Sequence, residues 1–355
     1  MTVPVSFESQ ALRQIPAWVT APPPDGMDAQ SSLQWWNGLA AAEQQAYLHQ
    51  QPSALGGMDG LPAEVRHEAN LQVLRGDAAA GSRPEEAQAL LDRVEQSWNG
   101  PEGERIHLLD YQPPGRGGED AKVVASIGNP DHADNIAVYV PGTGSDLGNF
   151  SGSLDRADEL RAQSGMIPGS GETVAIAWLG YDAPDHIPAA VLPGYAIDGA
   201  PALQSFTQGL HGNNPDARVT VIGHSYGSTV VGTADALDGG LGVQDIIAMG
   251  SPGMGYEQPS NVGLLFDDIT IGGIDEMNIA PGHFWAGANS NDVVTYTQAH
   301  GNSPVDWSFG GQRIATGDLS GHSSYWDNGS ESLRNQAYII TGNYEQVTTE
   351  RRRVG

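Results

Sequence analysis

From Glu104 onward, hydrophobic residues fall into short continuous runs that alternate with segments of helical periodicity. The runs at residues 136–140 (IAVYV) and 174–178 (VAIAW) show no polar alternation, which is typical of strands buried on both faces of a mostly parallel sheet. The pattern predicts strands at residues 105–110, 121–127, 135–140, 173–178, 218–222, 244–249, 283–288 and 311–316. It predicts intervening helices at residues 151–163, 199–210, 226–238 and 329–341. The alternation predicts an α/β fold with a doubly wound, mostly parallel eight-stranded sheet, whose first two strands form an antiparallel pair.

We place this α/β domain at residues 104–345. The hydrophobic pattern of the region before it is different. Residues 1–30 are rich in proline and predict an irregular arm. Residues 31–103 predict several short helices, and we expect them to pack on the α/β domain because a few short amphipathic helices rarely form a core of their own. Residues 346–355 predict a polar, solvated C-terminal tail.

One junction between a predicted strand and helix carries a Gly-x-Ser-x-Gly pattern, GHSYG at residues 223–227. In a chain with 47 glycines the pattern alone is a weak indicator, and an ordinary turn is the alternative. Its position after strand 218–222 and before helix 226–238 is the order that a nucleophile elbow requires, because a sharp turn exposes the serine oxygen. The pattern therefore predicts Ser225 as a nucleophile.

A serine nucleophile needs a base and an acid that orients the base, and in a sheet of this type they follow in the chain order Ser, Asp or Glu, His. His322 lies between the last predicted strand and helix and is the expected base. Asp292 lies in the loop after strand 283–288 and is the expected acid. The competing histidines are His283, expected to be packed at a strand, and His300, expected to be exposed in a loop. The competing acids are Asp155, Asp158, Asp267, Asp268 and Asp306.

An acyl-transfer site also needs two backbone N–H groups that bind the developing oxyanion. The residue after the nucleophile, Tyr226, is the first expected donor. The second is expected from the loop PGTGS at residues 141–145, with Thr143 preferred and Gly144 next. A phosphate-binding turn is the alternative for this loop, although it lacks the Gly-Lys-Ser/Thr ending of a P-loop.

Composition limits the partners and cofactors. With 16 basic and 43 acidic residues the chain has a net charge of -27, which disfavours nucleic acid and anionic membranes as partners. It has no cysteine and no histidine pair at metal-ligand spacing, so neither a metal nor another cofactor is expected. No apolar run is long enough to span a membrane, and the N-terminus lacks a signal-peptide pattern. We expect a soluble, cytoplasmic chain as given, with export by an unconventional route or from a longer precursor left open; the oligomeric state is undefined.

These motifs together resemble the α/β-hydrolases, and more closely the actinobacterial α/β-hydrolases that are grouped as a family of unknown function. The blocks that carry the resemblance are residues 139–145, 178–181, 223–228, 250–253 and 322–326. The resemblance implies an α/β-hydrolase fold and serine-hydrolase machinery. It implies no substrate.

The expected reaction is a two-step acyl transfer, in which His322 deprotonates Ser225 and water later releases the acyl group. The expected pocket residues are Trp178, Leu179, Tyr181, Met254, Tyr256 and Phe284, together with the proline-rich segment 184–193. Residues 181–198 are expected to form a small lid. This apolar wall and the acidic surface favour a small, uncharged, partly apolar carboxylic ester. Two alternatives remain open: an acyltransferase or other chemistry that uses the same triad, and a non-catalytic binding protein that keeps the scaffold.

Overall fold

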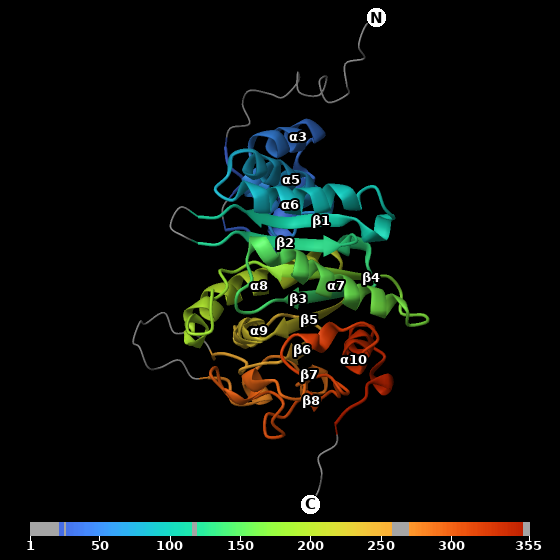
Figure 1. The fold of residues 1–355 in the computed structure, drawn as a ribbon. Helices are drawn as coiled ribbons and strands as arrows, with labels where there is room; N and C mark the ends of the chain where they lie inside the picture. Colours follow the sequence, from blue (N-terminus) through green and yellow to red (C-terminus); the bar gives the residue numbers. More distant parts are fainter. Residues whose placement is uncertain (1–20, 25, 116–118, 258–269, 351–355) are drawn as a thin grey trace, which may run out of the picture.

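The computed structural model describes residues 21–24, 26–115, 119–257 and 270–350 of the chain. Figure 1 shows a central sheet with helices packed along it, and the N-terminal helices gathered at one end of the molecule. The chain runs through the sheet from β1 and β2, next to the N-terminal helices, to β8 at the opposite edge.

Within the described residues eight strands pair in one sheet, in the order β1-β2-β4-β3-β5-β6-β7-β8. The pairs β1/β2 and β2/β4 are antiparallel, and all pairs from β4 to β8 are parallel. The strands are Ile106–Gln112 (β1), Lys122–Ile127 (β2), Asn135–Val140 (β3), Thr173–Leu179 (β4), Arg218–His224 (β5), Asp245–Met249 (β6), Phe284–Gly287 (β7) and Gln312–Arg313 (β8). The predicted α/β fold, eight-stranded sheet and antiparallel first pair are confirmed.

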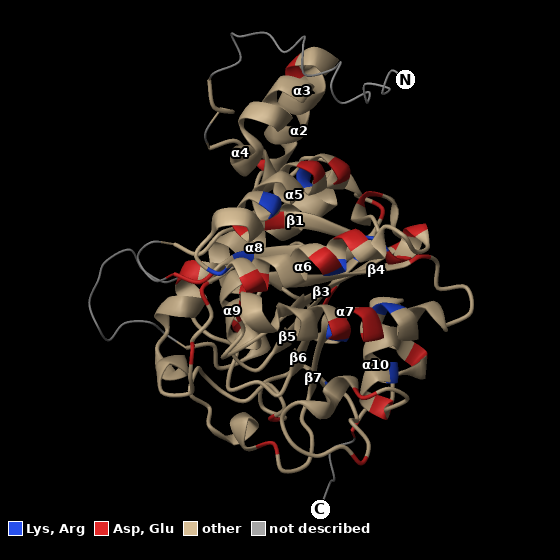
Figure 2. Ribbon diagram, turned by 45° about the horizontal axis from the view of Figure 1, so that its top comes forward, with Lys and Arg blue, Asp and Glu red and all other residues tan. Residues whose placement is uncertain are grey.

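The central strands are buried along their whole length, which explains their lack of polar alternation. Every residue of β3, β4 and β6 is buried. Helices α7 (Phe150–Gly165) and α10 (Glu331–Ile340) lie on one side of the strands, and α8 (Gly194–Asn213) and α9 (Tyr226–Ala236) lie on the other (Figure 2). Because both faces are covered, apolar side chains are buried on both faces of these strands, and polar side chains occur only at their first positions, Asn135, Thr173 and Asp245.

The last strand is shorter than predicted, and the C-terminal segment compensates for it. β8 comprises only Gln312–Arg313, whereas the sequence predicts a strand at residues 311–316. The backbone N–H of Glu350 donates to the carbonyl of Arg313 at 2.9 Å, and that of Ala315 donates to Thr348 at 2.9 Å. Residues 348–350 of the predicted polar tail are exposed and also hydrogen-bond to the sheet edge through their backbone; residues 351–355 lie outside the described residues.

Helix α8 begins earlier than predicted. It spans Gly194–Asn213 and contains Pro201, which has no N–H to donate to the preceding turn. This proline weakens the helical pattern in the sequence, but burial of Ala196, Ala200 and Leu203 in the core stabilises the helix. The segment predicted as a lid, residues 181–198, thus consists of a loop, the short 3₁₀ helix Ala189–Val191 and the first turn of α8.

The N-terminal helices form two layers. They are α2 (Ala29–Gly38), α3 (Ala41–Gln50), α4 (Pro52–Gly56), α5 (Ala63–Ala80) and α6 (Pro84–Ser97). Helix α5 packs on β1, where the amide of Asn70 donates to the carbonyl of Leu108 and accepts from the N–H of Tyr111. A smaller apolar cluster, separate from the core of the sheet, includes Trp36 of α2, Leu48 of α3 and Leu55 of α4. Helix α2 already begins within the predicted arm, of which residues 1–20 and 25 lie outside the described residues.

Candidate active site

Ser225 sits on a strained turn between β5 and α9. Its backbone has φ 53° and ψ -129°, a left-handed conformation that costs a non-glycine residue on the order of 1–3 kcal/mol. The turn is held because the Ser225 N–H donates to the carbonyl of Met249 at 3.0 Å. A Cβ on Gly223 would lie 2.5 Å from the Cα of Ser228, and a Cβ on Gly227 would lie 2.2 Å from the carbonyl oxygen of Val140. Both glycines are therefore required by the close packing of the turn.

The structure brings His322 and Asp292 into direct contact. Nδ1 of His322 lies 2.9 Å from each carboxylate oxygen of Asp292. Asp292 is 1% exposed and also accepts hydrogen bonds from the Tyr325 hydroxyl and, at 3.0 Å, from the Val294 N–H. Burial raises the pKa of Asp292, but the hydrogen bonds from His322 and Tyr325 outweigh it and leave this pKa below its usual 3.8. Asp292 is therefore an anion that holds the imidazole in one orientation.

Ser225 and His322 face the same cavity. The Nδ1 atom of His322 is used by Asp292, so Nε2 is the nitrogen left to act as a base. Ser225 Oγ and His322 Nε2 share no hydrogen bond in this structure. Such contacts are often long before a substrate binds, so the arrangement is compatible with proton transfer between the two.

His224, the residue before the serine, supports His322 from behind. Its Nε2–H donates to the backbone carbonyl of His322 at 2.8 Å, and the two rings lie 4.7 Å apart between centroids. Burial, together with the charges of His322 and Arg156, lowers the pKa of His224 to about 3. His224 is thus neutral at physiological pH and anchors the loop that carries His322. The sequence does not reveal this role of His224, nor the hydrogen bond from Tyr325 to Asp292, because both depend on contacts between distant segments.

The loop after β3 lies directly against the elbow. A Cβ on Gly142 would lie 2.8 Å from the carbonyl oxygen of His224 and 2.9 Å from the backbone nitrogen of Tyr226. Thr143 and Tyr226 both line the cavity, as expected for two oxyanion donors. The N–H of Gly144 instead donates to the carbonyl of Pro184 at 2.8 Å. Since Gly144 is already engaged there, Thr143 is the better candidate for the second donor.

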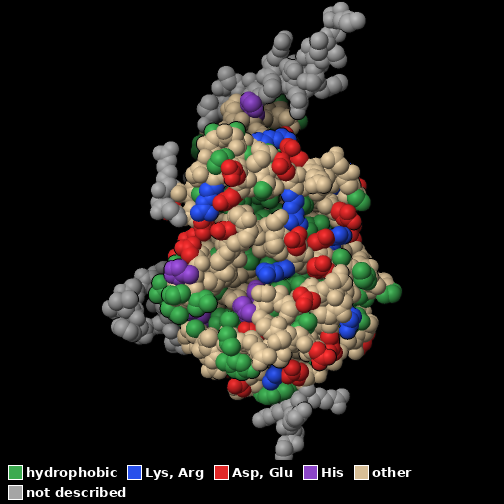
Figure 3. Space-filling view, in the orientation of Figure 1, with side chains coloured by type: hydrophobic (Ala, Val, Ile, Leu, Met, Phe, Trp, Pro, Cys, Tyr) green, Lys and Arg blue, Asp and Glu red, His purple; other side chains and the backbone are tan. Residues whose placement is uncertain are grey.

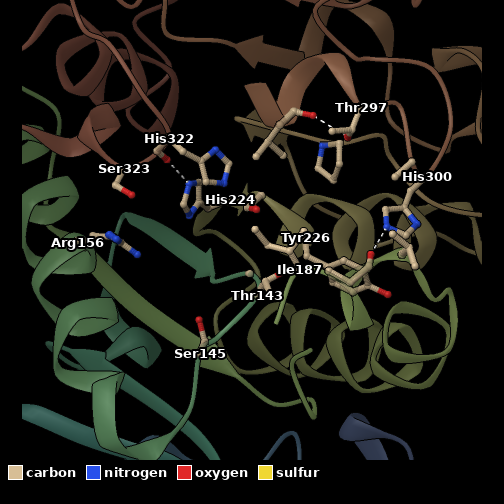
Figure 4. A pocket seen from close by; sticks show the side chains of 17 residues that line it. Thr143, Ser145, Arg156, Ile187, His224, Tyr226, Thr297, His300, His322 and Ser323 are labelled. Carbon is tan, nitrogen blue, oxygen red and sulfur yellow. Dashed lines mark hydrogen bonds between the residues drawn. The ribbon is translucent and has the colours of Figure 1, made fainter. Parts of the chain in front are cut away.

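The cavity around Ser225 has a volume of about 400 Å³ (Figure 4). Its lining comprises Gly142, Thr143, Ser145, Arg156, Ile187, Ala190, Val191, His224, Ser225, Tyr226, Pro252, Val294, Thr297, Ala299, His300, His322 and Ser323. Several large hydrophobic side chains beside it are exposed, namely Ile187, Val191, Leu192, Val293 and Tyr296. Figure 3 shows this face of the molecule, with histidine and basic side chains next to a group of hydrophobic ones. The cavity thus opens beside an apolar surface.

The aromatic residues predicted to wall the pocket lie in the core instead. None of Trp178, Leu179, Tyr181, Met254, Tyr256 and Phe284 lines the cavity, and each is at most 5% exposed. Trp178 lies near the end of β4 and stacks on Tyr181, whose hydroxyl donates to the carbonyl of Pro141 at 2.8 Å. Tyr181 therefore supports the loop that carries Thr143. Large side chains fill the layer behind the site, and smaller aliphatic ones form its wall.

His300 was expected to be exposed, and this prediction is wrong. It is 1% exposed and lines the cavity. Its Nε2–H donates to the carbonyl of Ala190 at 2.6 Å, and its Nδ1 accepts from the hydroxyl of Tyr256 at 2.6 Å. Burial lowers the pKa of His300, against a smaller opposing effect of the bond to Ala190. With both nitrogens engaged, His300 has none left to accept a proton from Ser225.

The other competing residues lie in different contacts. His283 precedes β7, at the opposite end of the strand from Asp292, and its Nδ1 lies 3.1 Å from the carboxylate of Asp245. Asp306 accepts from the backbone N–H and the hydroxyl of Ser308. Asp155 and Asp158 pair with Arg93 and Arg161, and Asp267 and Asp268 lie outside the described residues. None of the described competitors is in contact with His322.

Among the described residues, no group of three or more His, Asp or Glu side chains is placed to hold a metal ion. No helix in the described part of the chain has the length and apolar character needed to cross a membrane.

Two uncharacterized mycobacterial proteins resemble this chain. One, from Mycobacterium tuberculosis, is 28% identical over 383 residues, which cover 92% of this chain and 58% of that protein. The other, from Mycobacterium bovis, is 32% identical over 201 residues, which cover 52% of this chain and 69% of that protein. The chain therefore spans little more than half the length of the first of these relatives.

The chain is also similar to two esterase-type solved structures and to one protein family. A Trichoderma reesei cutinase in complex with a phosphonate inhibitor is 16% identical, covering 59% of this chain and 76% of that chain with a TM-score of 0.35. The esterase rPPE is 13% identical, covering 78% of this chain and 93% of that chain with a TM-score of 0.40. The family described as alpha/beta hydrolase matches residues 115–302, more than half of the chain, including Ser225 and Asp292. The chain therefore belongs to the alpha/beta hydrolase family.

Proposed function

We propose that this protein is a serine hydrolase that cleaves a carboxylic ester through an acyl-enzyme on Ser225. The observation that supports this most strongly is the hydrogen bonding of His322 to the buried carboxylate of Asp292, beside a cavity that also exposes Ser225. An anionic acid, an oriented imidazole and a serine on a strained elbow are the three parts that nucleophilic acyl transfer needs.

In the proposed first step, Nε2 of His322 accepts the hydroxyl proton of Ser225 as Oγ bonds to the ester carbonyl carbon. The carbonyl π electrons move to oxygen, and the N–H groups of Tyr226 and Thr143 donate to this oxyanion. As the carbonyl reforms, the bond to the alcohol oxygen breaks and His322 protonates the leaving alcohol. Asp292 holds the Nδ1–H tautomer and stabilises the imidazolium between the two proton transfers.

In the second step, His322 deprotonates a water molecule that attacks the acyl carbon, and the carboxylic acid leaves as Ser225 recovers its proton. The aliphatic lining from Ile187, Ala190, Val191 and Val294 favours an uncharged, apolar acyl group. A cavity of about 400 Å³ is large enough for a small organic ligand. We therefore propose an ester with an apolar acyl chain.

Turnover of a panel of para-nitrophenyl esters with graded acyl length tests this proposal. We expect hydrolysis by the wild-type chain, a preference among acyl lengths, and loss of turnover in Ser225→Ala. Product analysis with an added alcohol separates hydrolysis from acyl transfer to that alcohol. If Ser225→Ala hydrolyses the esters as fast as the wild-type chain, the proposed function is wrong.

A further inference from the structure

The two ends of the cavity differ in chemistry. Figure 4 shows His322, Ser323, Arg156 and Ser145 at one end, and Ile187, Thr297 and His300 at the other. Tyr226, which follows Ser225 in the sequence, lies between these two groups, and His224, which precedes it, lies beside His322 (Figure 4). The nucleophile therefore lies between an end that carries the guanidinium of Arg156 and an end whose labelled side chains include no Arg or Lys.

Arg156 is held in place by aromatic rings. It extends from α7, and its Nη1–H donates to the hydroxyl of Tyr139 at 2.9 Å. Its guanidinium carbon lies 5.9 Å from the ring centroid of Tyr139 and 5.4 Å from that of Trp326. Packing against two rings fixes the planar group, so less side-chain entropy is lost when a ligand binds to it.

Arg156 has no acidic partner in the described part of the chain. The described arginines that do form ion pairs are Arg66, Arg75, Arg83, Arg93, Arg161, Arg218 and Arg313. No Asp or Glu is among the described residues that line the cavity. In a chain with 43 acidic residues, a preoriented cation in an acid-free part of a cavity leaves its charge available to a ligand.

We propose that Arg156 binds an anionic group, a carboxylate or a phosphate, on the alcohol part of the substrate ester. This inference rests on the function proposed above. As the acyl-enzyme forms, His322 must protonate the leaving alcohol oxygen, so the alcohol part lies at the His322 end of the cavity. Arg156 and Ser323 lie at that end (Figure 4). The guanidinium N–H groups not used by Tyr139 can donate two parallel hydrogen bonds to such an anion.

This proposal refines the expectation of an uncharged ester, which relied on the net charge of -27. Surface charges are screened over roughly 8–10 Å at physiological salt, whereas a guanidinium in the cavity acts at contact distance. The hydroxyls of Ser145 and Ser323 line the same end and can donate further hydrogen bonds. The acyl part remains uncharged and apolar in this scheme, and the anion belongs to the alcohol part only.

The test uses matched aryl butyrates whose phenol ring carries a meta carboxylate, a meta phosphonomethyl group or a neutral meta carboxamide. We expect the wild-type chain to have a higher kcat/KM for an anionic ester than for the neutral one. In Arg156→Gln this ratio should fall at least about tenfold, because a charge-assisted hydrogen bond is lost. Arg156→Lys should retain part of it, since the charge remains without the planar fork. The control Arg334→Gln removes an exposed arginine of α10 that donates to Gly329 and should keep the wild-type ratio.

The ratio of kcat/KM for the anionic ester to that for the neutral ester is insensitive to a general loss of activity, such as one caused by weaker packing on Tyr139. The carboxylate and phosphonate arms identify which anion is preferred. An equal ratio in Arg156→Gln and the wild-type chain would show that Arg156 only packs on its aromatic neighbours and would overturn the proposal. So would an Arg156-dependent preference for an ester with its carboxylate on the acyl side, as in a neutral aryl monoester of glutarate.

A binding measurement separates this inference from the proposed function. If the wild-type chain fails to hydrolyse even the neutral butyrate, the proposed function fails. Calorimetry with meta-hydroxybenzoate, the product alcohol, still reports on Arg156. A Kd at least about tenfold weaker in Arg156→Gln supports the anion site, and an equal Kd contradicts it.

Discussion

His322 and His300 both line the cavity around Ser225, but their ring nitrogens have different partners. His322 uses only Nδ1, which contacts Asp292, and its side chain is 31% exposed. His300 uses both nitrogens, with Ala190 and Tyr256 as partners, and is 1% exposed. The same side chain thus has a nitrogen free for the proposed role as a base in one loop, and links two segments through both nitrogens in the other.

The difference shows that proximity to a nucleophile does not by itself make a histidine a base. A base needs a free nitrogen that faces the serine and a charged partner that stabilises the imidazolium. At His322, Asp292 supplies that charge. At His300, a backbone carbonyl and a phenol hydroxyl join the short helix Ala189–Val191 to the loop at residue 300. His300 is therefore a structural residue of the cavity wall.

The largest contrast is expected between His322→Ala and His300→Ala. The first should lower kcat for a neutral ester by at least about 10³, because Ser225 loses its base. The second should lower kcat by less than about tenfold, because the triad remains intact and only hydrogen bonds in the wall are lost. Steady-state kinetics of the two folded variants, with folding checked by circular dichroism, measure the contrast.

The reverse ranking would contradict this assignment. If His300→Ala were the more damaging change while both variants stayed folded, His300 would be the base and the hydrogen bonds described for it would have to rearrange on substrate binding.

A smaller loss is expected from Asp292→Asn. The amide retains the shape of the carboxylate but can present an N–H to His322 Nδ1, which favours the wrong imidazole tautomer, and it carries no charge. We expect kcat to fall on the order of 10⁴, less than the roughly 10⁶ that loss of the base can cost in such a triad. Kinetics at neutral pH check this value, and an activity equal to that of the wild-type chain would show that another acid serves His322.

Tyr325→Phe should have a milder effect. The Tyr325 hydroxyl donates to Asp292 and accepts from the N–H of Asn289 at 3.1 Å. Its removal leaves that buried N–H unpaired, so the free energy of unfolding should fall by about 1–3 kcal/mol. We expect kcat to fall by about tenfold at most, since the bond between Asp292 and His322 remains. Urea denaturation and kinetics test the two effects separately; an unchanged stability would mean that water replaces the hydroxyl.

The last expected effect is on stability alone and concerns pH and His224. Its pKa is lowered from 6.5 to about 3 in the folded chain, so between these values the unfolded chain binds a proton that the folded chain does not. The free energy of unfolding should therefore decrease as pH falls from 6.5 towards 3, by up to about 1.4 kcal/mol per pH unit from this residue. His224→Gln should show a flatter dependence in denaturation curves recorded between pH 7 and pH 5. Parallel dependences in the two chains would show that His224 is not the neutral anchor of His322.

The sequence predicts the fold well because its strands are buried on both faces and separated by helices. The runs IAVYV and VAIAW at residues 136–140 and 174–178 could be placed in a parallel sheet without further information. The chain order of Ser225, Asp292 and His322 could be anticipated because the carboxyl ends of neighbouring parallel strands meet at one edge. Both the local patterns and the topology can therefore be inferred from the order of residues along the chain.

The wall of the cavity could not be predicted in the same way. Trp178 and Tyr181 follow a strand towards the site, but their bulk is accommodated in the core behind it. The predicted proline-rich segment 184–193 does contribute to the lining through Ile187, Ala190 and Val191. The lining from residues 294–300 was not predicted, because its position depends on long-range contacts like that of His300 with Ala190. The role of Arg156 likewise depends on Tyr139 and Trp326, which are distant in the sequence.

The most direct test of the central claim is covalent labelling of Ser225 by a fluorophosphonate, followed by intact mass and peptide mapping. We predict a single label on Ser225 in the wild-type chain and in Ser323→Ala, a control that changes a hydroxyl lining the same cavity. Ser225→Ala should remain unlabelled under the same conditions. Labelling of Ser225→Ala to the wild-type extent, or of a different serine in the wild-type chain, would contradict the account.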